Sequence, residues 1–445
     1  MNTTTVRTIN SGAALGLMLG GVLSVAQQAA AADFDYALSA GAYYSDNLGR
    51  TPTNENGTFA AALGADVSAR ERAGRFRYDV LADLTYFEYT DSSYDGELLG
   101  TGRASGSFAF VPERFIWNAS AGLGQARQSL LLPSTPSNRR DRIDMSTGPE
   151  FILRLGLANE IRASAQYART DYSGGGAEDQ ESTGGRVVYN RRPSPRLSYG
   201  LGASFDTTKY PNNGALTASD FDRKEAFAVF SGRGPRTFVE AEVGYSTLKG
   251  GTVDSNGLLT RATLARRLTP SSTLSVSAER EFATAEPGYG REFSTPVLPS
   301  TGSTNDFAFG VPQQRDNFQA AYAFVRPRTT VDISLGTRRD RLLSGPSATR
   351  RFDSLRGSVM RRISPTIDGA LFAERTSDRF ELLGVDADET SFGTRVSVAL
   401  SPRYSIDFSL RHNERNSNVG GADFTELAGG VFLRYGSVPR RDLFE

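Results

Sequence analysis

The 445-residue chain contains no cysteine and a single histidine, His412. Without cysteine the chain can form no disulfide bond, no thiolate metal site and no thiol nucleophile. One histidine also leaves too few nitrogen and sulfur ligands for a typical zinc site. We therefore expect neither a metal nor a cofactor.

An excess of positive charge is also missing, because 50 Lys and Arg residues are balanced by 50 Asp and Glu residues. Nucleic-acid-binding domains are usually basic, so this balance argues against a nucleic-acid partner. After residue 32, no apolar run approaches the roughly 18 residues that mark a membrane-spanning helix. This excludes a conventional helical membrane protein.

The first 32 residues predict a secretory signal peptide. Arg7 is their only charged residue, an apolar run covers Ala13 to Val25, and Ala30-Ala31-Ala32 is a small-residue cleavage site. The alternative is a retained anchor helix, but this run is shorter than the ~20 residues that a span needs. No cysteine follows the run, so lipoprotein processing is excluded. We expect residues 33–445 to form a single domain.

The rest of the chain alternates apolar residues with polar or small ones. In the segment 196–206, "RLSYGLGASFD", Leu, Tyr, Ala and Phe fall on one face and Ser, Gly and Asp on the other. The segments 115–123, 238–245, 404–410 and 427–435 repeat the pattern. A period of two residues is typical of strands and not of helices.

Short and long connections also alternate along the chain. Nine are tight and rich in Pro, Gly or Arg, and the ten longer polar loops are expected at 46–57, 90–98, 128–142, 173–180, 210–222, 249–257, 286–314, 342–349, 380–388 and 414–422. A soluble β-sandwich would not need this strict alternation, whereas outer-membrane barrels have short periplasmic turns and long external loops. The sequence therefore predicts a closed antiparallel transmembrane β-barrel of about 20 strands (18–22), located in the outer membrane of a Gram-negative bacterium.

Alternation also predicts which polar residues point into the lumen. The candidate pore-lining residues are Arg77, Asp79, Asp83, Arg162, Gln166, Glu240, Glu242, Arg261, Glu279, Asp332, Asp368, Glu374, Arg395, Asp407 and Arg411. Both signs of charge are present, so we expect a mixed field that suits neutral or weakly charged sugars better than small ions. The longest loop, 286–314, is the candidate for a segment that folds inward as a plug; the alternative is an external loop.

No catalytic site is expected. A hydrolase would need His412 beside a serine and an orienting polar group, and Ser409 and Asn413 are near it in sequence. The simpler interpretation is a solvated histidine at the outer end of a strand. Glu240 and Glu242 share one strand face, as an acid–base pair could, but two carboxylates that face a wet lumen are the commoner explanation.

The segment "YYSDNLGRTPTNENG" (43–57) and the strand pair "AALGADVSARERAGRFRYDVLADLTYFEY" (61–89) resemble the N-terminal pattern of the β-barrel porin 2 family. That family is similar to barrels associated with exopolysaccharide gene clusters and the PEP-CTERM sorting system. The resemblance implies an integral outer-membrane barrel that exports a surface polysaccharide. It carries over no binding residues.

The leading functional hypothesis is thus a passive conduit for exopolysaccharide secretion. The alternative is a general or sugar-selective diffusion porin, and a third class is an outer-membrane hydrolase or a structural anchor. The expected partners are outer-membrane lipid, the barrel-assembly machinery, a polysaccharide cargo and periplasmic polysaccharide-export proteins.

Overall fold

The computed structural model describes residues 33–53, 56–129, 131–173, 179–211, 220–251, 253–283, 312–343 and 348–437. These residues form twenty strands and one short 3-10 helix, η1 (Pro136–Asn138). The strands are β1 (Asp33–Ser45), β2 (Thr58–Glu71), β3 (Phe76–Tyr89), β4 (Glu97–Val111), β5 (Phe115–Arg127), β6 (Arg139–Leu155), β7 (Asn159–Tyr172), β8 (Gln180–Ser194), β9 (Leu197–Lys209), β10 (Phe221–Arg233), β11 (Thr237–Gly250), β12 (Val253–Thr269), β13 (Ser272–Ala283), β14 (Gln313–Arg326), β15 (Thr329–Leu342), β16 (Thr349–Ser364), β17 (Ile367–Phe380), β18 (Val385–Ala399), β19 (Tyr404–Ser417) and β20 (Phe424–Gly436).

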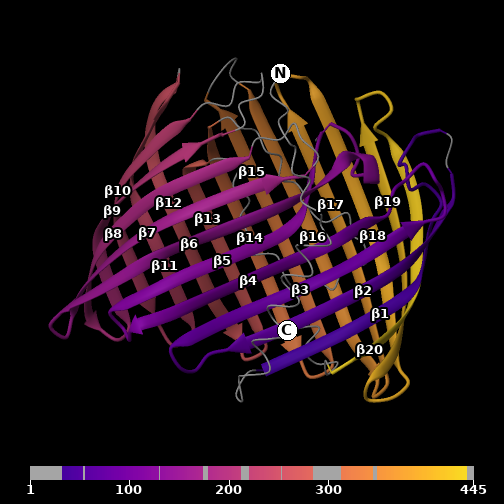
Figure 1. Cartoon of the computed structure of the whole chain (residues 1–445), viewed down its shortest axis with the longest axis horizontal. Coiled ribbons are helices and arrows are strands. Elements are labelled where there is room, and N and C mark those ends of the chain that lie inside the picture. The colour runs from indigo at the N-terminus through magenta and orange to yellow at the C-terminus, as the bar shows by residue number, and fades with distance from the viewer. Residues whose placement is uncertain are drawn as a thin grey trace, which may run out of the picture.

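The strands close into one barrel. Each strand pairs antiparallel with its neighbours in sequence, and β1 pairs with β20 from Ala37↔Gly436 to Ser45↔Ala428. Tilted strands wrap continuously around the barrel, with β1 to β7 on the near wall and the orange strands β14 to β17 behind them (Figure 1). Closure leaves no unpaired strand edge, which is the condition for crossing a bilayer with strands. The predicted closed antiparallel transmembrane β-barrel of about 20 strands is confirmed.

The two faces of the sheet differ in chemistry. In β20, Leu427, Val431 and Leu433 point outward and are 44%, 48% and 49% exposed, whereas the intervening Glu426 and Ala428 are buried. Large apolar side chains are exposed on the outer face of nearly every strand. An apolar exterior and a polar interior are the reverse of a soluble protein and typical of a transmembrane barrel.

All nine tight connections lie where the sequence places them, between β2 and β3 and between each following even strand and its successor. Gly74 (φ +76°) and Gly156 (φ +79°) occupy left-handed positions in two of them, which favour glycine. These short turns and both ends of the strand series lie at one end of the barrel, and the longer loops lie at the other.

Several long loops are shorter than predicted. The expected loop 249–257 is only the connection 251–252, because β11 runs to Gly250 and β12 starts at Val253. Lys249 pairs with Asp254 across this hairpin at 3.3 Å. Likewise, β18 starts at Val385, inside the predicted loop 380–388. The prediction was wrong there because the ends of these strands are polar and extend beyond the apolar band of the barrel. In the sequence, such polar strand ends have the pattern of a loop.

Within the part of the chain that the structure describes, no helix is long and apolar enough to cross a membrane. The predicted signal peptide, residues 1–32, lies outside the described residues, as does most of the predicted plug loop, residues 286–311.

Candidate functional site in the lumen and its mouth

The inner face of the sheet carries every residue predicted to line a pore. Residues directly opposed in an antiparallel ladder share a face, and the ladder places Asp79 opposite Arg70, Glu242 opposite Arg261, and Arg395 opposite Ser409. The same register puts the remaining predicted residues on this face, opposite the one that carries the exposed apolar side chains. Their role in conducting a solute stays a prediction.

The charges on the inner wall are largely paired. Arg261 on β12 lies 2.5 Å from Glu242 and 2.6 Å from Glu281, and Arg186 on β8 also pairs with Glu242. Arg186 in addition lies over the ring of Phe227, at 4.1 Å. This network ties five strands together along the wall.

Similar pairs continue around the barrel. Arg315 and Arg338 both contact Asp340, at 2.9 and 3.1 Å. Further pairs join Arg350 to Asp378, Arg395 to Asp407 and Arg434 to Asp66, each at 2.6 Å. Because each of these arginines has a carboxylate beside it, this part of the wall presents paired charges and not a field of one sign.

At the long-loop end, the segment 46–53 folds into the lumen. Leu48 is 6% exposed and packs with Ala60, Phe87 and Leu99 on the inner wall. The Asn47 side chain donates to the carbonyl oxygens of Thr51 and Thr425. The first loop is therefore not wholly external.

Arg50 links this segment to β20 across the barrel seam, which is the place where β20 pairs with β1. Its Nε and Nη2 donate to Glu426 of β20 at 3.0 and 2.7 Å, and its guanidinium lies 4.9 Å from the ring centre of Phe424. Burial alone would lower the pKa of Arg50, but the Glu426 carboxylate raises it above its ordinary value. Ser45 and Asn413 donate to the same carboxylate.

A second loop, between β5 and β6, also reaches the lumen. The Asn138 side chain donates to the carbonyl oxygens of Ser129 and Pro133 and so holds the loop compact. Arg415 of β19 donates to the carbonyl oxygen of Leu131 at 3.2 Å. This contact places the loop against strands on the other side of the mouth.

Together these loops enclose a buried charged group that we call the mouth cluster: Arg50, Arg127, Glu389, Arg411, Arg415 and Glu426. Four arginines face two glutamates. Arg411 donates to Ser391 and Asn413, and Arg415 lies 3.6 Å from Glu389.

Arg127, the last residue of β5, is also a member of the mouth cluster. It is 7% exposed, and among the described residues no carboxylate lies within ion-pair distance of it. A buried cation without a close counter-ion is costly. The mouth cluster is therefore the part of the lumen best suited to an anionic group.

His412 does not belong to this site. It points outward, with its ring 4.9 Å from that of Phe392, whereas Ser409 and Asn413 face the lumen. Because residues one and three positions apart on a strand point to opposite faces, the histidine cannot meet either partner.

Sequence reasoning found Arg411 but missed the other five members of the mouth cluster. Arg415, Glu389 and Glu426 lie on the inner face, so a longer run of the same alternation would have included them. Arg50 lies in a loop and Arg127 at a strand end, where alternation carries no information.

No protein-family model matches the chain, and no curated protein matches it. Among solved structures, the chain is similar to the FrpB iron transporter from Neisseria meningitidis (F3-3 variant), with 10% identity, a TM-score of 0.46, and 91% of this chain and 81% of the other covered. It is also similar to the siderophore receptor PirA from Acinetobacter baumannii, with 9% identity, a TM-score of 0.47, and 90% and 80% covered. The ferric enterobactin receptor PfeA from Pseudomonas aeruginosa has 10% identity, a TM-score of 0.46, and 92% and 81% covered. At such scores these similarities assign neither a family nor a ligand to this chain.

Proposed function

We propose that the chain is an outer-membrane channel that serves as a passive conduit for exopolysaccharide leaving the cell. The main support for the proposal is the inner wall, whose charges are compensated in ion pairs while the exterior of the barrel is apolar. A barrel of twenty strands is too wide for its wall side chains to fill, so the lumen is wet except where loops enter it.

The mechanism would be solvation and not catalysis. Hydroxyl, amide and paired charged groups on the wall exchange hydrogen bonds with a sugar chain as water does, without holding it tightly. Direction would come from periplasmic polysaccharide-export proteins, and insertion from the barrel-assembly machinery. Membership of the β-barrel porin 2 family, which the N-terminal strands suggest, is part of the same proposal.

A sugar-selective diffusion porin is the second candidate. The inward-folded segments that surround the mouth cluster favour it, because they narrow one side of the opening as a size filter would. Loops that fold into the lumen hinder a long polymer more than a short sugar. The two functions therefore predict different behaviour of the same mouth.

Planar-bilayer recordings and a gene deletion distinguish the candidates. A conduit should show conductance that purified polysaccharide of the host blocks from the periplasmic side, and its deletion should abolish surface polysaccharide. A porin should pass oligosaccharides in a liposome-swelling assay, and its deletion should slow sugar uptake. Strong selectivity for small ions, with no block by polysaccharide, would contradict the conduit.

A further inference from the structure

A group of arginines faces outward at the long-loop end of β15 to β17. Arg339 and Arg341 lie in the last four residues of β15, Arg351 is the third residue of β16, and Arg379 is the next-to-last residue of β17. All four side chains are exposed. We call them the outer arginine patch.

Three members of the patch lie side by side across the sheet. Arg339 is directly opposite Arg351, and Arg351 is directly opposite Arg379. Opposed residues on one face have Cβ atoms ~5 Å apart, and like charges in such positions destabilise a sheet. A row of three arginines at this spacing is therefore unfavourable unless anions lie between them.

The protein itself supplies part of that negative charge, because the ladder places Asp316 opposite Arg339 and Asp386 opposite Arg379 on the same face. Arg351 pairs with Asp353 on its own strand at 2.9 Å. Within the described residues, neither Arg339 nor Arg379 has a carboxylate within ion-pair distance. With Arg341 and Arg280 on the same face, five arginines face three carboxylates, so the surface keeps a net positive charge. The guanidinium groups of Arg339 and Arg379 can therefore bind a further anion.

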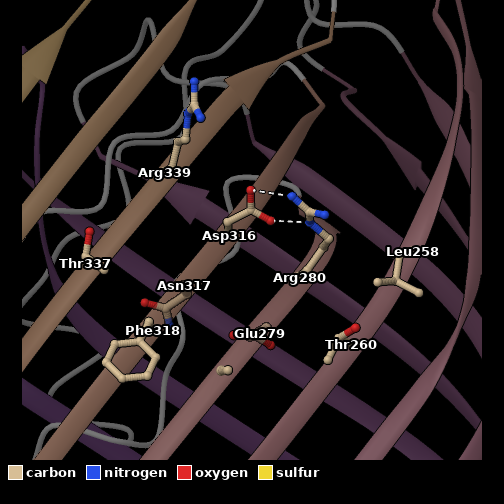
Figure 2. A pocket seen from close by; sticks show the side chains of 10 residues that line it. Leu258, Thr260, Glu279, Arg280, Asp316, Asn317, Phe318, Thr337 and Arg339 are labelled. Carbon is tan, nitrogen blue, oxygen red and sulfur yellow. Dashed lines mark hydrogen bonds and ion pairs between the residues drawn. The ribbon is translucent and has the colours of Figure 1, made fainter.

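A shallow hollow of about 340 Å³ on the outer face adjoins the patch (Figure 2). Arg280 and Asp316 pair within it at 2.5 Å, and Arg339 lies beside them on the same face. Leu258 and Phe318, which are 53% and 40% exposed, give the hollow apolar walls. A cationic rim beside an apolar depression fits an amphipathic molecule with an anionic head.

We infer that the outer arginine patch binds the phosphorylated headgroup of a glycolipid in the outer leaflet, with an acyl chain in the hollow. Arginine forms paired hydrogen bonds with phosphate oxygens, and its charge does not depend on pH in the physiological range. Basic pockets on the surface of membrane proteins bind anionic lipid headgroups by the same chemistry. A phosphate between opposed arginines would turn their repulsion into attraction.

Native mass spectrometry of the full chain in detergent tests this inference, with bisphosphorylated lipid A and its dephosphorylated form as probes. We expect the wild type to retain the phosphorylated lipid at least tenfold better than the dephosphorylated one. The triple variant Arg339→Gln, Arg351→Gln, Arg379→Gln should lose this preference. The matched control replaces Arg191, Arg266 and Arg361, which also face outward but at the short-turn end, and should keep it.

Equal retention of both lipids by the wild type would overturn the inference whatever the variants do. So would an unchanged preference in the patch variant, or an equal loss in the control. Inorganic phosphate should not displace the lipid at equal concentration, since it lacks the acyl chain; displacement would show a free-anion site in place of a lipid site. The folded state of each variant is checked by the heat-modifiable migration of the barrel on gels.

Discussion

Replacing Glu426 with Gln should release the segment 46–53 from the lumen. The ion pair between Arg50 and Glu426 is almost fully buried, with side-chain exposures of 5% and 2%. Glutamine keeps the shape and one acceptor oxygen but removes the charge. Breaking a buried pair leaves an uncompensated charge and costs about 3–5 kcal/mol.

The substitution should destabilise the closed position of the segment 46–53 and leave the stability of the barrel nearly unchanged. The strand ladders on either side of the seam are backbone hydrogen bonds, in which the Glu426 side chain takes no part. The free energy that holds the segment closed should therefore drop by most of this amount, which corresponds to about 10²- to 10³-fold faster local opening. Hydrogen exchange at the amides of Arg50 and Thr51, which donate to Asn47, measures it directly.

The matched control is Asp79→Asn, at the opposite end of the lumen. The pair of Asp79 with Arg70 has the same 2.7 Å separation, but its side chains are 34% and 37% exposed. Water screens such a pair, so its loss should cost only ~0–1 kcal/mol. If Glu426→Gln exchanged no faster than this control, and its single-channel conductance did not rise, the mouth would not be held by this ion pair.

Three further substitutions test separate parts of the structure. Arg127→Gln should shift the reversal potential in a salt gradient toward weaker anion preference, because Arg127 is the buried cation without a close carboxylate; an unchanged potential would place the ion path elsewhere. Leu335→Arg, at the middle of the outer face of β15, should destabilise the barrel in liposomes by about 2–4 kcal/mol, while Ser334→Arg on the inner face should cost much less in the same urea titration. His412→Ala should leave conductance unchanged and alter stability by no more than ~1 kcal/mol, and a larger conductance change would show that the outward histidine affects the lumen.

The strand count and the tight turns were predictable because they depend on local chemistry. Proline, glycine and arginine at the nine short connections interrupt the alternation of apolar and polar residues. A barrel in a bilayer requires this alternation, because one face of each strand meets lipid and the other meets the lumen. Gly251 (φ +55°) shows the limit of this reasoning. Gly251 lies in the two-residue connection between β11 and β12, and the residues around it are polar. A polar sequence of this kind predicts a loop even where the backbone pairs as strands.

The mouth cluster was not predictable, because its contacts join distant parts of the chain. Ser45 donates to Glu426 from 381 residues away, and Arg50 reaches the same carboxylate across 376 residues. No pattern within a loop specifies such a partner. Alternation assigns Glu426 to the inner face, but only the closed barrel shows which loop lies over it.

The mouth cluster also lies on the seam where the barrel closes. Glu426 belongs to the last strand, Ser45 ends the first strand, and Arg50 follows it in the first loop. These groups come together only when β20 pairs with β1, a contact whose chain-entropy cost is set by nearly the whole length of the chain. The attachment of the segment 46–53 to β20 is therefore a consequence of closure and cannot precede it. The other wall pairs described here join neighbouring or nearby strands and can form as each hairpin is added, whereas the pair of Arg434 with Asp66, like the mouth cluster, joins strands on the two sides of the seam and needs the closed barrel.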